Sequence, residues 1–271
     1  MKLINISIGK ILLILLCVFS LTIKAQKLPN KQEKSVWAPA NIKIDGKADE
    51  WEDKYQAYNN ATDIFYTVSN DDQNIYLTIK IKNLLVMTKI VKGGVSFTIN
   101  HTVKKKDDFP ITVTYPVLKS GDANSISSLV NIKAGVHNKV TGIDNSFESL
   151  NNAFTTKSKV LNVHGIKDID ISDDEMSIYN DKGIKAASRF DKPLAYIYEL
   201  AIPLKYLALP NNGTDAFSYH IKLNVKDTEI NFDTAVPVNL AHADLPPPPP
   251  PATISIAATD FWGEYTLAKK P

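Results

Sequence analysis

Aromatic side chains are the residues of this chain that could best recognise a ligand. A flat ring stacks on the C–H face of a sugar, and planar polar side chains then bond the hydroxyl groups. The candidates are Trp262 and Trp37. Trp262 stands where a terminal loop is expected to meet a strand, so its ring is either exposed or closes the core beside Phe261. Trp37 is either a second stacking ring or an edge anchor. Four tyrosines lie nearby or on expected strands: Tyr66, Tyr115, Tyr219 and Tyr265.

Catalytic motifs do not occur in the sequence. It has no Gly-x-Ser-x-Gly nucleophile turn, no phosphate-binding glycine loop and no dinucleotide fingerprint. A glycosidase needs only two opposed carboxylates, which leaves that activity open, but no glutamate stands in a motif with such a role. We therefore expect a non-catalytic protein.

Metal ligands are equally sparse. The acidic stretch 168–175 does not fit an EF-hand loop, because Asp173 stands where glycine is needed and Tyr179 where the bidentate glutamate belongs. The five histidines show no His-Glu-x-x-His spacing. We expect no metal site and no cofactor. A calcium ion held by scattered carboxylates is the alternative that the sequence leaves open.

The first 25 residues have the pattern of an export signal. Lys2 and Lys10 stand before an apolar run at 11–21, and Ala25 offers a small residue for cleavage. That run is too short to span a bilayer, so we expect no membrane span after cleavage. Cleavage also removes Cys17, the single cysteine. We expect an exported protein without disulfides, in the periplasm, on the outer-membrane surface or outside the cell.

Charge and composition narrow the class of partner. The chain has 271 residues, and its 31 Lys+Arg against 29 Asp+Glu give a net charge of +2. That balance does not predict a nucleic-acid partner. Hydrophobic residues make up 44%, which is enough for a sizeable core.

Apolar residues alternate with polar ones along several short segments, at 75–82, 95–99, 111–115 and 221–226. A period of two places one set of side chains in a core and the other in water. Turn signals stand between such segments, among them Asp45-Gly46, where glycine can take a positive φ. The pattern predicts an all-β fold, an antiparallel β-sandwich.

The expected organisation follows from breaks in this pattern. We expect a loose N-terminal tail over 26–36 and one β-sandwich domain over 37–271. Residues 116–160 are polar with weak helical spacing, which predicts a partly helical insertion. The six prolines at 246–251 predict a stiff extended loop that leads to the last strand.

Four ordered motifs carry a family resemblance. They are Ile-Asp-Gly-Lys-Ala-Asp-Glu-Trp at 44–51, Asn-Asp-Asp-Gln-Asn-Ile-Tyr-Leu at 70–77, Glu-Leu-Ala-Ile-Pro at 199–203 and Phe-Trp-Gly-Glu-Tyr-Thr-Leu at 261–267. This set resembles the family 9 carbohydrate-binding modules and their relatives with a DOMON-like β-sandwich. We interpret Trp51 as a core anchor, and Glu199 as a sheet-edge or cross-strand partner.

The chain departs from that family at the sugar clamp. Sugar-binding members carry one Trp before the strand that matches 93–99 and another in the last loop. Here Met87 to Ile90 precede the strand, and the loop 256–260 has no Trp. The resemblance thus implies the fold, while the family's binding residues have no counterparts.

Two functions of different classes remain. The first is a binding module for a carbohydrate or glycan, with Trp262 and Trp37 as the ligand-binding residues. The second is a structural or assembly protein of the cell envelope that binds a protein partner through the same scaffold. An open aromatic groove would favour the first, and a buried Trp262 with a broad apolar patch would favour the second.

Overall fold

The computed structural model describes residues 27–104, 110–135, 147–166, 175–209, 215–226, 229–231, 253–255 and 257–271. The expected signal peptide, the acidic stretch at 168–174 and the proline run at 246–251 lie outside the described residues.

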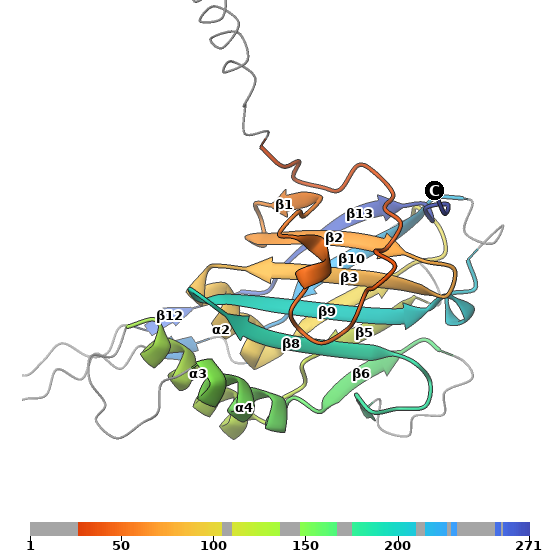
Figure 1. Cartoon of the computed structure of the whole chain (residues 1–271). Coiled ribbons are helices and arrows are strands. Elements are labelled where there is room, and N and C mark those ends of the chain that lie inside the picture. Colours follow the sequence, from red (N-terminus) through yellow and green to blue (C-terminus); the bar gives the residue numbers. More distant parts are fainter. Residues whose placement is uncertain are drawn as a thin grey trace, which may run out of the picture.

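The protein is mostly β, and the expected all-β antiparallel sandwich is confirmed. One sheet has five strands in the order β1-β2-β3-β9-β8, and the other has six in the order β13-β10-β4-β5-β6-β7 (Figure 1). All pairings between these strands are antiparallel. A separate ribbon pairs β11 with β12.

The five-stranded sheet is formed by β1 (Ala57–Asn59), β2 (Ile64–Asn70), β3 (Asn74–Ile81), β8 (Lys185–Asp191) and β9 (Ala195–Pro203). The six-stranded sheet is formed by β4 (Val95–Ile99), β5 (Ile111–Tyr115), β6 (Val160–His164), β7 (Glu175–Ser177), β10 (Phe217–Leu223) and β13 (Thr259–Tyr265). The remaining elements are β11 (Glu229–Asn231), β12 (Thr253–Ser255), the 3-10 turns η1 (Asp49–Trp51) and η2 (Leu204–Tyr206), and the helices α2 (Leu84–Gly93), α3 (Ser120–Lys133) and α4 (Phe147–Lys157).

The two sheets differ in what covers their outer faces. β4 and β5 alternate between buried and half-buried residues, as expected of strands with one face in the core. In β9, by contrast, all nine residues are buried. The second face of β9 lies under the loop that carries η1 (Figure 1), where Ile197 packs against Ala48 and Trp51. In the described part of the chain, most outward residues of the six-stranded sheet are half-buried or exposed, and we call this side its open face.

Trp51 is buried as expected, but it does not lie in the core between the two sheets. It is 7% exposed and packs on the outer face of β9, in a cluster separate from the inter-sheet core. The interpretation of Glu199 as a sheet-edge or cross-strand partner is wrong. β9 lies inside the sheet, between β3 and β8, and the Glu199 carboxylate bonds the backbone of the overlying loop.

The expected loose tail is a packed segment from residue 27 onward. Gln32 is 6% exposed, and its side chain bonds both the N–H and the C=O of Val68 in β2. The Ser35 hydroxyl donates to the C=O of Thr266, just beyond β13. The segment therefore joins the neighbouring edges of the two sheets.

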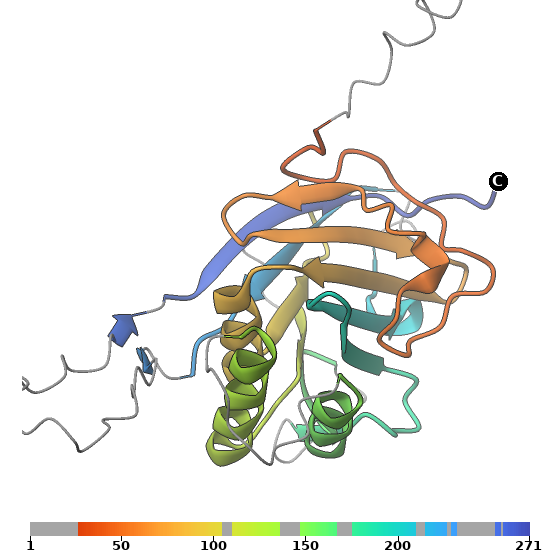
Figure 2. The same cartoon turned by 60° about the vertical axis from the view of Figure 1, so that its left-hand side comes forward.

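The polar insertion does contain helices, and they contribute to the core. α3 and α4 lie side by side next to the sheets in both views (Figures 1 and 2). Ile126 and Val130 of α3 and Leu150 and Phe154 of α4 are buried in the inter-sheet cluster. Phe154 packs edge-on against Phe190 and Tyr196. These few apolar residues were enough to bury one side of each helix.

Helix α2 was not expected. Asn83 begins it, because its side-chain oxygen accepts bonds from the N–H groups of Leu85 and Val86. The helix ends at Gly94, whose φ of 77° lies in the left-handed region. Met87 and Ile90 are fully buried, so the stretch that corresponds to the family's first clamp Trp is part of the core.

Candidate functional site

The open face of the six-stranded sheet is polar. Alternation points the second set of side chains on each strand outward, and these are mostly hydroxyl, amide or charged groups. Pairs of hydroxyl groups bond across neighbouring strands, at 2.8 Å between Thr98 and Thr112 and 2.6 Å between Ser96 and Thr114. A face with fixed hydroxyl groups suits a ligand that carries hydroxyl groups itself.

One row across this face contains the candidate Trp262. Strand register places Trp262 opposite His220, His220 opposite Thr98, Thr98 opposite Thr112, and Thr112 opposite His164. Five strands therefore contribute one residue each to the row. Trp262 itself lies in the middle of β13, so the expected position at a loop-to-strand junction is wrong.

His220 holds the Trp262 ring in place. The two rings are stacked, with centroids 4.3 Å apart and an interplanar angle of 6°. On the same face, His220 Nε2 lies 2.7 Å from Asp260 Oδ2, at ion-pair distance when the imidazole is protonated. Asp260 and Trp262 are two residues apart on β13, so both reach His220 from one strand. The indole is thus fixed before any ligand arrives, which lowers the entropic cost of binding.

A groove of about 420 Å³ lies beside Trp262, and we call it the Trp262 groove. It is lined by Lys31, Gln32, Glu33, Val103, Ser218, Trp262, Gly263 and Glu264. Trp262 is half-buried, while Lys31, Glu33 and Glu264 are exposed. Carboxylates that accept and an ammonium group that donates thus surround an aromatic ring, which is the combination that sugar recognition requires.

Trp37 is not brought to this groove. It forms an isolated bridge with Asn70 at the end of β2, where the N-terminal segment pairs with the five-stranded sheet. Its neighbours are tied to that strand, because Ala38 donates to the C=O of Asn70 and Asn70 donates to the C=O of Val36. Trp37 is half-buried. The two tryptophans do not form one clamp.

His220 is the functional candidate that sequence reasoning missed. The alternation of 217–223 does mark it as an outward residue, like Trp262 within 259–265. What the sequence does not contain is the pairing of these two strands, or the register that sets the rings opposite one another.

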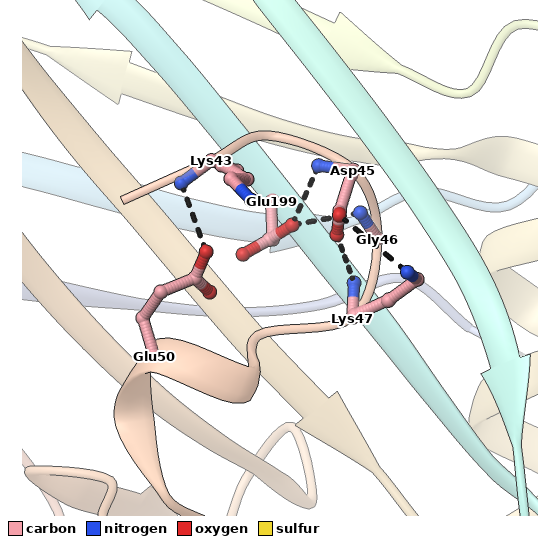
Figure 3. Close-up of polar contacts among 6 residues, drawn as sticks. All are labelled: Lys43, Asp45, Gly46, Lys47, Glu50 and Glu199. Atoms are coloured by element: carbon pink, nitrogen blue, oxygen red, sulfur yellow. Dashed lines mark hydrogen bonds and ion pairs between the residues drawn. The ribbon is translucent and has the colours of Figure 1, made fainter. Parts of the chain in front are cut away.

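A second unusual feature is the carboxylate of Glu199. It is fully buried, and its Oε2 accepts bonds from the N–H groups of Asp45 at 3.0 Å and Gly46 at 2.7 Å (Figure 3). Gly46 has a φ of 81°, which fits the expected Asp-Gly turn. Within the described part of the chain, Glu199 Oε1 has no hydrogen-bond partner.

Burial sets the protonation behaviour of this group. Desolvation raises the pKa of Glu199 from 4.5 to about 7, against the two backbone bonds that lower it. The nearby charges of Glu50 and Asp45 raise it further. Glu50 also accepts from the N–H of Lys43, so the whole 43–50 loop is closed on itself above β9 (Figure 3).

Metal ligation finds no support in the described ranges, where no three His, Cys, Asp or Glu side chains are grouped closely enough to hold an ion. None of the helices described here has the length and apolar character needed to cross a membrane.

Comparison with known proteins gives no match: no family model, no curated protein and no solved structure corresponds to this chain.

Proposed function

We propose that this protein is an exported, non-catalytic binding module that recognises a carbohydrate at the Trp262 groove. The scaffold would be that of the family 9 carbohydrate-binding modules and their DOMON-like relatives, as the four sequence motifs suggest. The observation that carries the proposal is the fixed indole of Trp262. It stacks on His220, which bonds Asp260, on an open face made of hydroxyl and charged groups.

The contact chemistry supports a saccharide. An indole and a sugar ring associate through the flat apolar C–H face, while Glu33, Glu264 and Lys31 lie within the same groove and can bond the hydroxyl groups. Affinity would be modest, because these exposed polar groups are solvated before the ligand binds.

The rival function, an envelope protein that binds a protein partner, needs a broad apolar patch. Among the described residues, the only large hydrophobic side chains that are exposed are Val103 at 47% and Tyr179 at 76%. Two separated residues do not make such a patch. The described surface therefore favours the carbohydrate over the protein partner.

The test is binding of the purified protein to a glycan array, beside Trp262→Ala and, as the matched control, Trp37→Ala. We expect saturable binding to one class of glycan, lost in Trp262→Ala and kept in Trp37→Ala, since Trp37 does not line the groove. Circular dichroism would establish that both variants are folded. The proposal fails if the folded parent binds no glycan, or if Trp262→Ala binds as well as the parent. A pull-down from the envelope would then test the protein-partner function.

A further inference from the structure

A second cavity lies on the opposite side of the sandwich from Trp262. It has a volume of about 800 Å³ and opens on the outer face of the five-stranded sheet, beside the covering loop. Its floor includes Tyr76 of β3 and Ala201 of β9, and its walls come from the 42–44 loop, the 72–74 turn and the segment before β8. Ligand pockets commonly have about 300–1,000 Å³. We call this cavity the lysine pocket.

Positive charge dominates its rim. Four lysines and two aspartates line it, for an excess of two positive charges: Lys43, Lys182, Lys185, Lys205, Asp72 and Asp181. Lys182 lies 3.6 Å from Asp181, and Lys205 lies over the ring of Tyr206 at 4.8 Å. Lys43 and Lys185 are exposed, and both reach the pocket from different segments. Ammonium groups that line one cavity from two segments can both bond an anionic ligand.

The rest of the lining suits a ligand that is more than a simple anion. Ile42 and Ile44 pack on Tyr76 and Ala201 and give the floor an apolar part. Carboxylates on the rim accept hydrogen bonds only, while ammonium groups donate only. A ligand with both hydroxyl groups and a carboxylate satisfies each of these, whereas inorganic phosphate offers no apolar surface to the isoleucines of the floor.

We infer that the lysine pocket binds a short acidic saccharide, a uronate oligomer whose carboxylates bond Lys43 and Lys185. This site stands apart from the proposed function, because it uses neither Trp262 nor the six-stranded sheet. It gives the protein a second face with its own ligand chemistry.

Glu199 positions one wall of this pocket. Its bonds to the N–H groups of Asp45 and Gly46 fix the turn that follows Lys43, and Glu50 fixes the N–H of Lys43 itself (Figure 3). The wall is therefore set before the ligand arrives.

The test is calorimetric titration of the purified protein with trigalacturonate. Its fully methyl-esterified form is the neutral comparator, and inorganic phosphate is the simple anion. The variant is Lys43→Ala/Lys185→Ala. The matched control is Lys119→Ala/Lys159→Ala, which removes the same charge at two exposed positions outside the pocket.

We expect saturable binding of trigalacturonate, with the ester and phosphate binding at least about tenfold more weakly. Lys43→Ala/Lys185→Ala should lower the affinity by about tenfold, as two solvent-exposed ion pairs are lost. Both Lys119→Ala/Lys159→Ala and Trp262→Ala should bind as the parent does.

Four outcomes overturn the inference. The first three are no binding at millimolar trigalacturonate, equal binding of the neutral ester, and an equal loss in the two lysine double variants. The third would mean attraction by net charge alone. Loss in Trp262→Ala with retention in Lys43→Ala/Lys185→Ala would assign the saccharide to the Trp262 groove. That result supports the proposed function and ends the case for a second site.

Discussion

Trp262 and His220 occupy paired positions on β13 and β10, and their rings lie parallel with centroids 4.3 Å apart. The imidazole is in turn bonded to Asp260, which precedes Trp262 by two residues on the same strand. The His220 and Asp260 side chains thus fix the Trp262 ring on an otherwise polar face.

The stack predicts a role for His220 in ligand affinity. His220→Ala frees the indole to adopt other rotamers, so we expect the glycan identified on the array to bind about 3- to 10-fold more weakly, the range of one ring pair. Titration calorimetry measures this. Lys222→Ala, an outward residue of the same strand, is the control and should bind normally. Unchanged affinity in His220→Ala would show that the ring needs no support.

Glu199 predicts a pH-dependent stability. Its pKa is about 7 in the folded protein against an ordinary 4.5, so the folded state holds the proton more tightly. The free energy of unfolding therefore falls as pH rises from 4.5 to 7, by on the order of 3 kcal/mol, and the loss is complete above 7.

Glu199→Gln isolates this effect, because the amide oxygen can still accept both backbone bonds but does not titrate. Urea unfolding of both proteins from pH 4 to 8 should show the parent losing stability relative to Glu199→Gln across that window. Parallel profiles would contradict the raised pKa.

The position of Gly263, beside Trp262, has no room for a side chain. A Cβ at this position would overlap the ring and hydroxyl of the buried Tyr219. Tyr219 cannot easily move, since its hydroxyl bonds that of Tyr66 at 3.0 Å. We expect Gly263→Ala to lower the free energy of unfolding by about 1–3 kcal/mol, read from the urea midpoint. Gly121→Ala, where nothing lies within 4 Å, should cost nothing.

Phe154 predicts that the polar insertion is required for stability. Its ring is fully buried between Phe190 and Tyr196, so Phe154→Ala should cost about 3–5 kcal/mol. Thr156→Ala, exposed on the same helix, should change stability by less than about 0.5 kcal/mol. If both variants unfolded at the same urea concentration, α4 would contribute nothing to the core.

Much of the fold was predictable because its signals are local. The alternation at 75–82 and 111–115 became β3 and β5, and the Asp45-Gly46 turn formed with glycine at positive φ. The helical spacing of the polar insertion became α3 and α4. In each case a few neighbouring residues contain the whole pattern.

Features that depend on distant partners escaped prediction. The loop at 43–50 lies over β9 and bonds Glu199 through the N–H groups of Asp45 and Gly46. Neither the loop sequence nor the strand sequence alone indicates that the two segments are in contact. Helix α2 has only ten residues and is mainly apolar, and periodicity separates a short apolar run poorly from a buried strand. His220 was missed for the same reason, as only strand register sets it against Trp262.

One interior strand of each sheet is made late during synthesis. β9 begins at Ala195 and joins β3 to β8, while β10 begins at Phe217 and joins β4 to β13. A chain that ends before residue 195 contains only the meanders β1-β2-β3 and β4-β5-β6-β7 as paired strands, with β8 unpaired and the 43–50 turn without its carboxylate. Folding must therefore wait for the last third of the polypeptide, since such long-range pairings form slowly. Any factor that holds the nascent chain unfolded can act until β9 and β10 have been synthesised.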